Sequence, residues 1–150
     1  MADTIMTVDE ILDFAIQNEQ KAADLYSGLA EKATSRKVRE EFLQFAKEEQ
    51  GHAATLERVK RGQMLIGIEK QTQEINISDY SVDVEPGDAP DYQQILRFAI
   101  KQEEEAFRLY FALSSLVPEG EVKDLLYNLA KEEAKHKLRF ENELNAHVNS

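Results

Sequence analysis

Four glutamates and two histidines stand at positions where a helix of this sequence would be expected to bury apolar side chains. They are Glu19, Glu49, His52, Glu103, Glu133 and His136. In Glu49-x-x-His52 and in Glu133-x-x-His136 the two side chains are three residues apart, so they share one face of a helix. Carboxylate oxygens together with imidazole nitrogens suit borderline-hard divalent metal ions. The six residues therefore predict a metal site.

The sequence contains two copies of one helical hairpin, and this repeat strengthens the prediction. A shift of 84 residues (11 onto 95), without a gap, aligns residues 11–16 with 95–100, 25–26 with 109–110 and 46–49 with 130–133. The same shift places Glu19 on Glu103 and His52 on His136. A single Glu-x-x-His spacing is weak evidence for a metal site, but two in register on a repeat are strong evidence.

The first copy, residues 7–62, is predicted to be two long helices. Thr7 or Asp9 can cap the first helix, which we expect to continue to about Lys32. Ser35 then starts a second helix that ends near Gly62. The sequence is rich in Ala, Leu, Glu, Lys, Gln and Arg here, which agrees with helical propensity.

The second copy, residues 90–147, repeats this arrangement after a long connection. Pro90 and Asp91 open a helix that stops before Pro118, and residues 118–120 are expected to supply the first turn of the next helix. Residues 63–89 lack helical periodicity. They are predicted to be a crossover that returns the chain to the far end of the bundle. The apolar residues 64–66 and 68 are expected to pack on the bundle or on a partner. We predict an all-α four-helix bundle that forms one domain, residues 1–150.

Each predicted helix carries a glutamate in the middle of its apolar stripe. On the first helix the stripe is Leu12, Ala15, Ile16, Glu19, Ala22, Ala23 and Tyr26. Burying one isolated carboxylate costs several kcal/mol, and four would exceed the roughly 5–15 kcal/mol by which a domain is stable. The stripes offer no lysine or arginine at these heights. Two divalent cations would balance four carboxylates, and iron or manganese, or a mixed pair, fits this ligand set.

Composition excludes several other classes of protein. The net charge of −11 opposes binding to nucleic acid, and no apolar run is long enough to span a membrane. The absence of cysteine excludes disulfides, thiolate zinc sites and iron–sulfur clusters. The first residues lack the basic and apolar segments of an export signal, so we expect a cytoplasmic protein.

With these residues in place, the chain resembles the rubrerythrin branch of the ferritin-like di-iron proteins over nearly its whole length. The resemblance implies a ferritin-like bundle whose iron ligands are the six residues above, with Glu49 and Glu133 as the bridging carboxylates. It implies that Tyr26 and Tyr110 donate hydrogen bonds to ligand carboxylates; the alternative is that both are core aromatics. It also places Glu48 and Glu132 where acids accept the second N–H of the histidines, unless they are solvated.

Two departures from the family pattern affect the function. Rubrerythrins usually carry a rubredoxin domain with Cys-ligated iron, and since this chain has no cysteine, a separate protein must donate the electrons. Peroxidase members of the family also have a further glutamate three residues after the third-helix ligand. Ala106 stands there in this chain, and Ala22 is its counterpart in the first copy. The ligand set is therefore the plainer one of six residues.

The resemblance favours a di-iron oxidoreductase that reduces hydrogen peroxide, or dioxygen, at a carboxylate-bridged site and protects against oxidative stress. The alternatives are a ferroxidase, an iron-binding or storage protein without turnover, and a structural bundle whose metal only balances buried charge. The pseudo-twofold repeat favours a homodimer, which could exchange hairpins. We expect Glu104 and Glu105 to lie on a solvated face and His147 to be a surface histidine.

Overall fold

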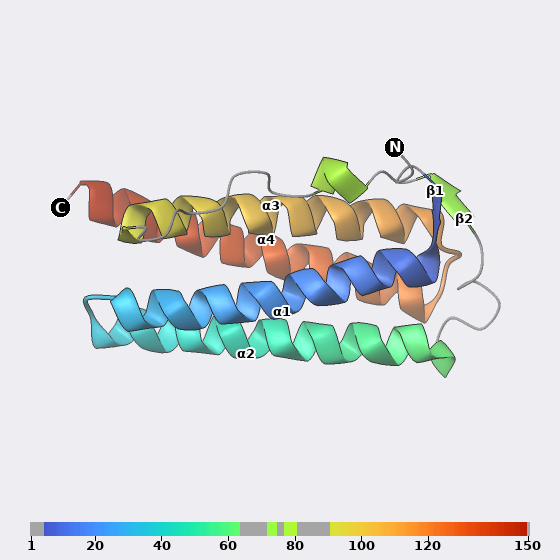
Figure 1. The fold of residues 1–150 in the computed structure, drawn as a ribbon, viewed down its shortest axis with the longest axis horizontal. Coiled ribbons are helices and arrows are strands. Elements are labelled where there is room, and N and C mark those ends of the chain that lie inside the picture. Colours follow the sequence, from blue (N-terminus) through green and yellow to red (C-terminus); the bar gives the residue numbers. More distant parts are fainter. Residues whose placement is uncertain (1–4, 64–71, 75–76, 81–90, 150) are drawn as a thin grey trace.

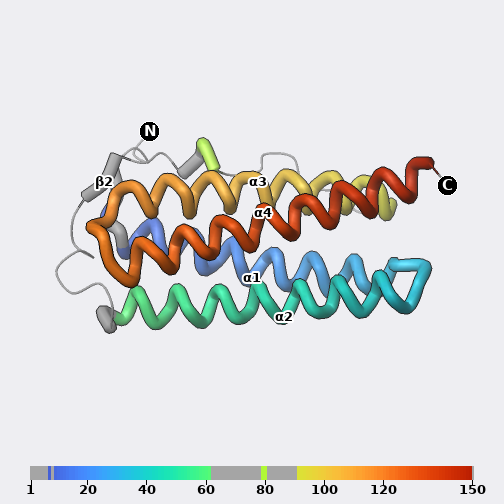
Figure 2. Tube along the Cα trace, turned by 180° about the vertical axis from the view of Figure 1, so that it is seen from behind, coloured from blue at the N-terminus to red at the C-terminus, as the bar shows by residue number. Residues whose placement is uncertain are grey.

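The protein is a bundle of two antiparallel helical hairpins packed side by side (Figure 1). The computed structural model describes residues 5–63, 72–74, 77–80 and 91–149. The four long helices are α1 (Val8–Lys32), α2 (Arg36–Arg58), α3 (Tyr92–Leu116) and α4 (Glu121–Val148). Contacts are most extensive within each hairpin, and the view from behind shows the same pairing (Figure 2). The predicted all-α four-helix bundle is confirmed.

The helices begin where the sequence provides capping side chains. Thr7 caps α1, because its hydroxyl accepts from the Glu10 amide at 3.1 Å while the Glu10 carboxylate accepts from the Thr7 amide at 2.9 Å. Asp91 and Gln94 form the same reciprocal pair at the start of α3, at 2.8 and 2.9 Å. Ser35 caps α2 as predicted. Each such cap contributes about 1 kcal/mol to the stability of its helix.

Two helix ends differ from the prediction. The α-helical part of α2 ends at Arg58 and continues as one π-helical turn, η1 (Val59–Gln63), instead of ending as a regular helix near Gly62. Residues 118–120 precede α4 and do not form its first turn. Gly120 is the N-cap and has a φ of 147°, a conformation that is open to glycine but does not belong to a helix.

The hairpins are joined by a connection that has to span the length of the bundle, because α2 ends at the opposite end from the start of α3 (Figure 1). Its described parts are β2 (Thr72–Glu74), which pairs antiparallel with β1 (Ile5–Thr7), and a 3-10 turn, η2 (Ile77–Tyr80), which contacts α3. The sequence did not predict this strand pair. The packing expected of residues 64–66 and 68 falls outside the described residues.

A layer of acidic residues divides the apolar core into two halves. One half contains Leu12, Leu56, Leu113 and Leu126, and the other contains Tyr26, Phe42 and Phe140. In the second half the ring centroid of Phe140 lies 4.8 Å from that of Tyr26 and 5.3 Å from that of Phe42. Well-packed apolar side chains on both sides thus fix the positions of the polar residues between them.

None of the described helices combines the length and apolarity that crossing a bilayer requires.

Candidate metal centre

The structure brings all six predicted ligand residues together between the four helices. None of them is more than 7% exposed. Their ligand atoms form two groups, each with all atoms within 4.8 Å of one another. These groups are Glu19, Glu49, His52 and Glu133, and Glu49, Glu103, Glu133 and His136. Glu49 and Glu133 belong to both groups, which is the position that a bridging carboxylate would occupy.

Both histidines turn the same ring nitrogen toward the carboxylates. Nδ1 of His52 lies 2.9 Å from Glu49 Oε1 and 3.5 Å from Glu133 Oε2, while its Nε2 lies 2.6 Å from Glu132 Oε1. A proton on Nε2 would be donated to the Glu132 carboxylate, leaving the Nδ1 lone pair directed at the cluster. This orientation is the one that a metal-binding histidine would need.

His136 repeats this arrangement in the other hairpin. Its Nδ1 lies 3.3 Å from Glu103 Oε2, and its Nε2 lies 2.7 Å from Glu48 Oε1. Each histidine is therefore paired with an acid from the opposite hairpin, since Glu48 is on α2 and His136 on α4. The predicted hydrogen bonds from the histidines to Glu48 and Glu132 are both present.

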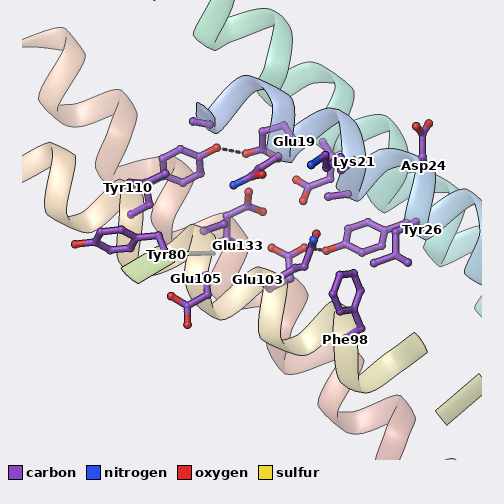
Figure 3. A pocket seen from close by; sticks show the side chains of 18 of the residues that line it. Glu19, Lys21, Asp24, Tyr26, Tyr80, Phe98, Glu103, Glu105, Tyr110 and Glu133 are labelled. Carbon is purple, nitrogen blue, oxygen red and sulfur yellow. Dashed lines mark hydrogen bonds between the residues drawn. The ribbon is translucent and has the colours of Figure 1, made fainter. Parts of the chain in front are cut away.

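Two buried tyrosines also connect the hairpins through hydrogen bonds to the cluster (Figure 3). The hydroxyl of Tyr26 donates to Glu103 Oε2, and the hydroxyl of Tyr110 donates to Glu19 Oε2. Burial, followed by the charge of Glu103, raises the pKa of Tyr26 well above its ordinary value, and burial together with Glu19 does the same for the pKa of Tyr110. Both phenols therefore stay protonated and act as hydrogen-bond donors.

Positive charge would stabilise the buried carboxylates of the cluster. Burial, followed by repulsion from Glu103 and Glu19, raises the pKa of Glu49 to about 8, and the same causes raise the pKa of Glu133 well above its ordinary value. Burial by itself would lower the pKa of His52, but the nearby carboxylates of Glu133, Glu19 and Glu49 raise it. The side chains of the cluster therefore retain protons, which a bound metal cation would displace.

The hydrogen bonding of the cluster provides a direct test of whether a metal would fit. Among the described residues, five buried ligand atoms have no hydrogen-bond partner: Glu49 Oε1, His52 Nδ1, Glu103 Oε1 and both carboxylate oxygens of Glu133. Buried polar atoms without partners are rare because each costs about 1–3 kcal/mol. These oxygen and nitrogen atoms have lone pairs free to coordinate two divalent ions. Hard or borderline metal ions suit such donors.

A cavity of about 630 Å³ between α1 and α3 opens onto this cluster. Its inner wall includes Glu19, Glu103, Tyr26 and Tyr110. The contacts between α1 and α3 are much less extensive than those within either hairpin, which leaves room between these two helices. This is therefore the side of the bundle from which a small molecule would approach the cluster.

Comparison with known proteins identifies the family. The sequence model described as Rubrerythrin matches residues 10–144, nearly the whole chain. The chain belongs to the rubrerythrin family. No curated protein matches the sequence.

Two solved structures are similar in fold to this chain. A hypothetical protein from Pyrococcus furiosus is 29% identical with a TM-score of 0.75, and the alignment covers 96% of this chain and 92% of that one. A protein from Thermotoga maritima, described provisionally as a ferritin-like diiron-carboxylate protein, is 18% identical with a TM-score of 0.77, over 93% of this chain and 95% of that one. The second similarity shows the fold, and the rubrerythrin family together with the buried cluster fits a di-iron site.

Three polar residues outside the predicted rubrerythrin ligand set can now be placed. Glu104 is partly exposed as expected and lies 3.5 Å from the Lys137 ammonium. The expectation of a solvated face was wrong for Glu105, whose side chain is only 13% exposed and lines the cavity. His147 is partly buried, with its Nδ1 3.1 Å from the side-chain amide of Gln93. Glu105 lies off the apolar stripe of α3, and its carboxylate pairs with Arg108, which also donates to the Asp79 carbonyl of the connecting segment.

Proposed function

We propose that the chain is a di-iron oxidoreductase that reduces hydrogen peroxide. The observation that supports this most strongly is the pair of ligand groups that share Glu49 and Glu133, each completed by one imidazole Nδ1. Iron is the metal that the family favours, and manganese or a mixed pair would suit the same donors. In this proposal the six residues hold both ions.

Bound iron would supply two electrons for reduction, one from each ferrous ion. Glu49 and Glu133, which belong to both ligand groups, would hold both ions, and the apolar layers on either side of the cluster limit the access of bulk water. Tyr26 and Tyr110 hold the carboxylates of Glu103 and Glu19 in place and keep their own protons. The cavity between α1 and α3 is the route by which the oxidant reaches the site.

A separate electron-donor protein would return the site to its reduced form, because the chain has no cysteine to bind a second iron centre. The repeated hairpins favour a homodimer as the assembled form.

The test is stopped-flow oxidation of anaerobic, ferrous-loaded protein by hydrogen peroxide and by dioxygen at equal concentration. Much faster oxidation by peroxide is expected. Equal or faster oxidation by dioxygen would overturn the assignment and favour a ferroxidase or oxidase. Ala106 is the specific reason to consider that second candidate, since peroxidase relatives have a glutamate at this position. Retention of both ions without reaction with either oxidant would indicate a structural metal site.

A further inference from the structure

The cavity between α1 and α3 is much larger than hydrogen peroxide requires. Its volume is about 630 Å³. A water molecule occupies about 30 Å³ in the liquid, so a peroxide with two oxygen atoms needs roughly twice that. Pockets that bind organic ligands measure about 300–1,000 Å³. The cavity therefore has the size of an organic-ligand site.

Outside the carboxylate cluster, apolar and aromatic side chains make up most of the cavity wall, which also includes Asn18, Lys21, Asp24, Gln102 and Glu105. The wall follows the internal repeat. Repeat-related residues face the cavity from α1 and α3, as the pairs Phe14 and Phe98, Asn18 and Gln102, Ala22 and Ala106, and Leu25 and Leu109. Each helix thus contributes aromatic, aliphatic and small side chains and one amide. Apolar walls with a few polar groups are typical of sites for organic molecules. The small side chains of Ala22 and Ala106 leave the space open close to the cluster.

The two sides of the cavity differ, and this gives a bound molecule a direction. On one side lie Tyr80 and Glu105, and on the other the exposed Lys21 and Asp24 (Figure 3). Arg108 holds Tyr80 in place: its guanidinium donates to the Asp79 carbonyl at 2.9 Å and lies 5.0 Å from the centre of the Tyr80 ring.

Arg108 also lies 2.5 Å from the Glu105 carboxylate. Tyr80 and Glu105 thus line one side of the cavity, and the exposed Lys21 and Asp24 line the other.

We propose that this cavity binds an organic hydroperoxide, with its apolar group against Phe14 and Phe98 and its hydroperoxide end at the carboxylate cluster. This inference rests on the proposed function and names its substrate class. Reduction breaks the O–O bond and yields the corresponding alcohol and water. It consumes two protons, which would come from solvent water, and two electrons, which two bound ferrous ions would supply and the electron-donor protein would restore. Hydrogen peroxide can react at the same centre without using the cavity walls.

Binding can be measured apart from the reaction with cumyl alcohol, the product of cumene hydroperoxide reduction. Zinc-loaded protein, which is diamagnetic and redox-inert, is titrated with the alcohol while backbone amide shifts are followed by NMR. Saturable shifts at residues 102 and 106 are expected. Ala106→Phe should weaken binding by about tenfold or more, because the larger side chain fills the cavity.

Asn18→Phe, at a partly exposed position, tests the same wall if Ala106→Phe does not fold. Ala112→Phe is the matched control, because Ala112 lies on the same helix, is also partly buried and does not line the cavity. The control should bind the alcohol like the wild type. Absence of saturable binding, or equal binding in all variants, would overturn the inference.

The kinetic counterpart is the ratio of the second-order rate constants for oxidation of ferrous protein by cumene hydroperoxide and by hydrogen peroxide. This ratio should fall about tenfold in Ala106→Phe and Asn18→Phe but not in Ala112→Phe. If hydrogen peroxide reacts and the ratio is the same in all variants, the cavity inference is wrong and the proposed function stands. If neither peroxide oxidises the ferrous protein, both are wrong.

Discussion

Replacing Glu132 by alanine should weaken the binding of one metal ion. Glu132 lies outside both groups of ligand atoms, yet its carboxylate is 2.6 Å from Nε2 of His52. Without this acceptor nothing fixes the Nε2 proton, and Nδ1 no longer presents its lone pair to the cluster in a defined orientation. The loss should therefore concern the ion nearest His52.

The expected loss follows from the contact and its exposure. Removing such a hydrogen-bond acceptor typically lowers metal affinity about 10–100-fold. The side chain of Glu132 is 49% exposed, so water can partly replace it and the loss should be near the lower limit. That corresponds to about 1.4 kcal/mol, or tenfold. Glu48→Ala should have a similar or larger effect at the other histidine, because Glu48 is 38% exposed.

The assay is anaerobic competition between the protein and a chelator for ferrous or manganous ions, which resolves two affinities per chain. Glu40→Ala is the control, since it removes the same charge from an exposed position on α2. Equal losses in Glu40→Ala and Glu132→Ala would show a general charge effect, and unchanged affinity in Glu132→Ala and Glu48→Ala would refute the reasoning from histidine orientation.

Three further predictions concern stability. Tyr26→Phe removes a buried hydrogen bond to the Glu103 carboxyl group and should lower the free energy of unfolding of the metal-loaded protein by roughly 1–3 kcal/mol in urea titrations; no change would contradict the contact. Phe140→Ala empties a fully buried site and should cost about 3–5 kcal/mol by the same measurement, and a loss below 1 kcal/mol would mean that the site collapses. Metal-free protein should lose stability as pH rises from about 5 to about 8, because the folded state keeps a proton on Glu49, whose pKa is about 8, while the unfolded chain has released it. Each such proton corresponds to about 1.4 kcal/mol per pH unit; with metal bound the trend should reverse, and parallel pH profiles with and without metal would count against the prediction.

The sequence was sufficient to predict the helices and the convergence of the six residues. Both follow from local rules: a period of 3.6 places Glu19 and Tyr26 on one face of a helix, and capping residues such as Thr7 mark its start. The internal repeat then aligns each residue of the first hairpin with one of the second. A buried glutamate in one hairpin therefore predicts a buried glutamate at the aligned position of the other.

Features that depend on contacts between distant segments could not be predicted in this way. The sequence indicated that Glu48 and Glu132 could accept hydrogen bonds from the histidines, but the pairing of Glu132 with His52 depends on how the hairpins pack. The strand pair of β1 and β2 also joins distant segments. The cavity depends on the spacing between α1 and α3, and the contact of Arg108 with Asp79 involves the connection, whose sequence has no periodicity. The roles of the six residues as ligands stay predictions until metal binding is measured.

The most direct test of the metal centre is the iron content of anaerobically loaded, desalted protein. We predict two ferrous ions per chain in the wild type and none in the Glu49→Ala, Glu133→Ala double variant, because these two residues belong to both ligand groups. Far-UV circular dichroism checks that the variant remains helical. One ion or none in the wild type, or two ions retained in the double variant, would contradict the account.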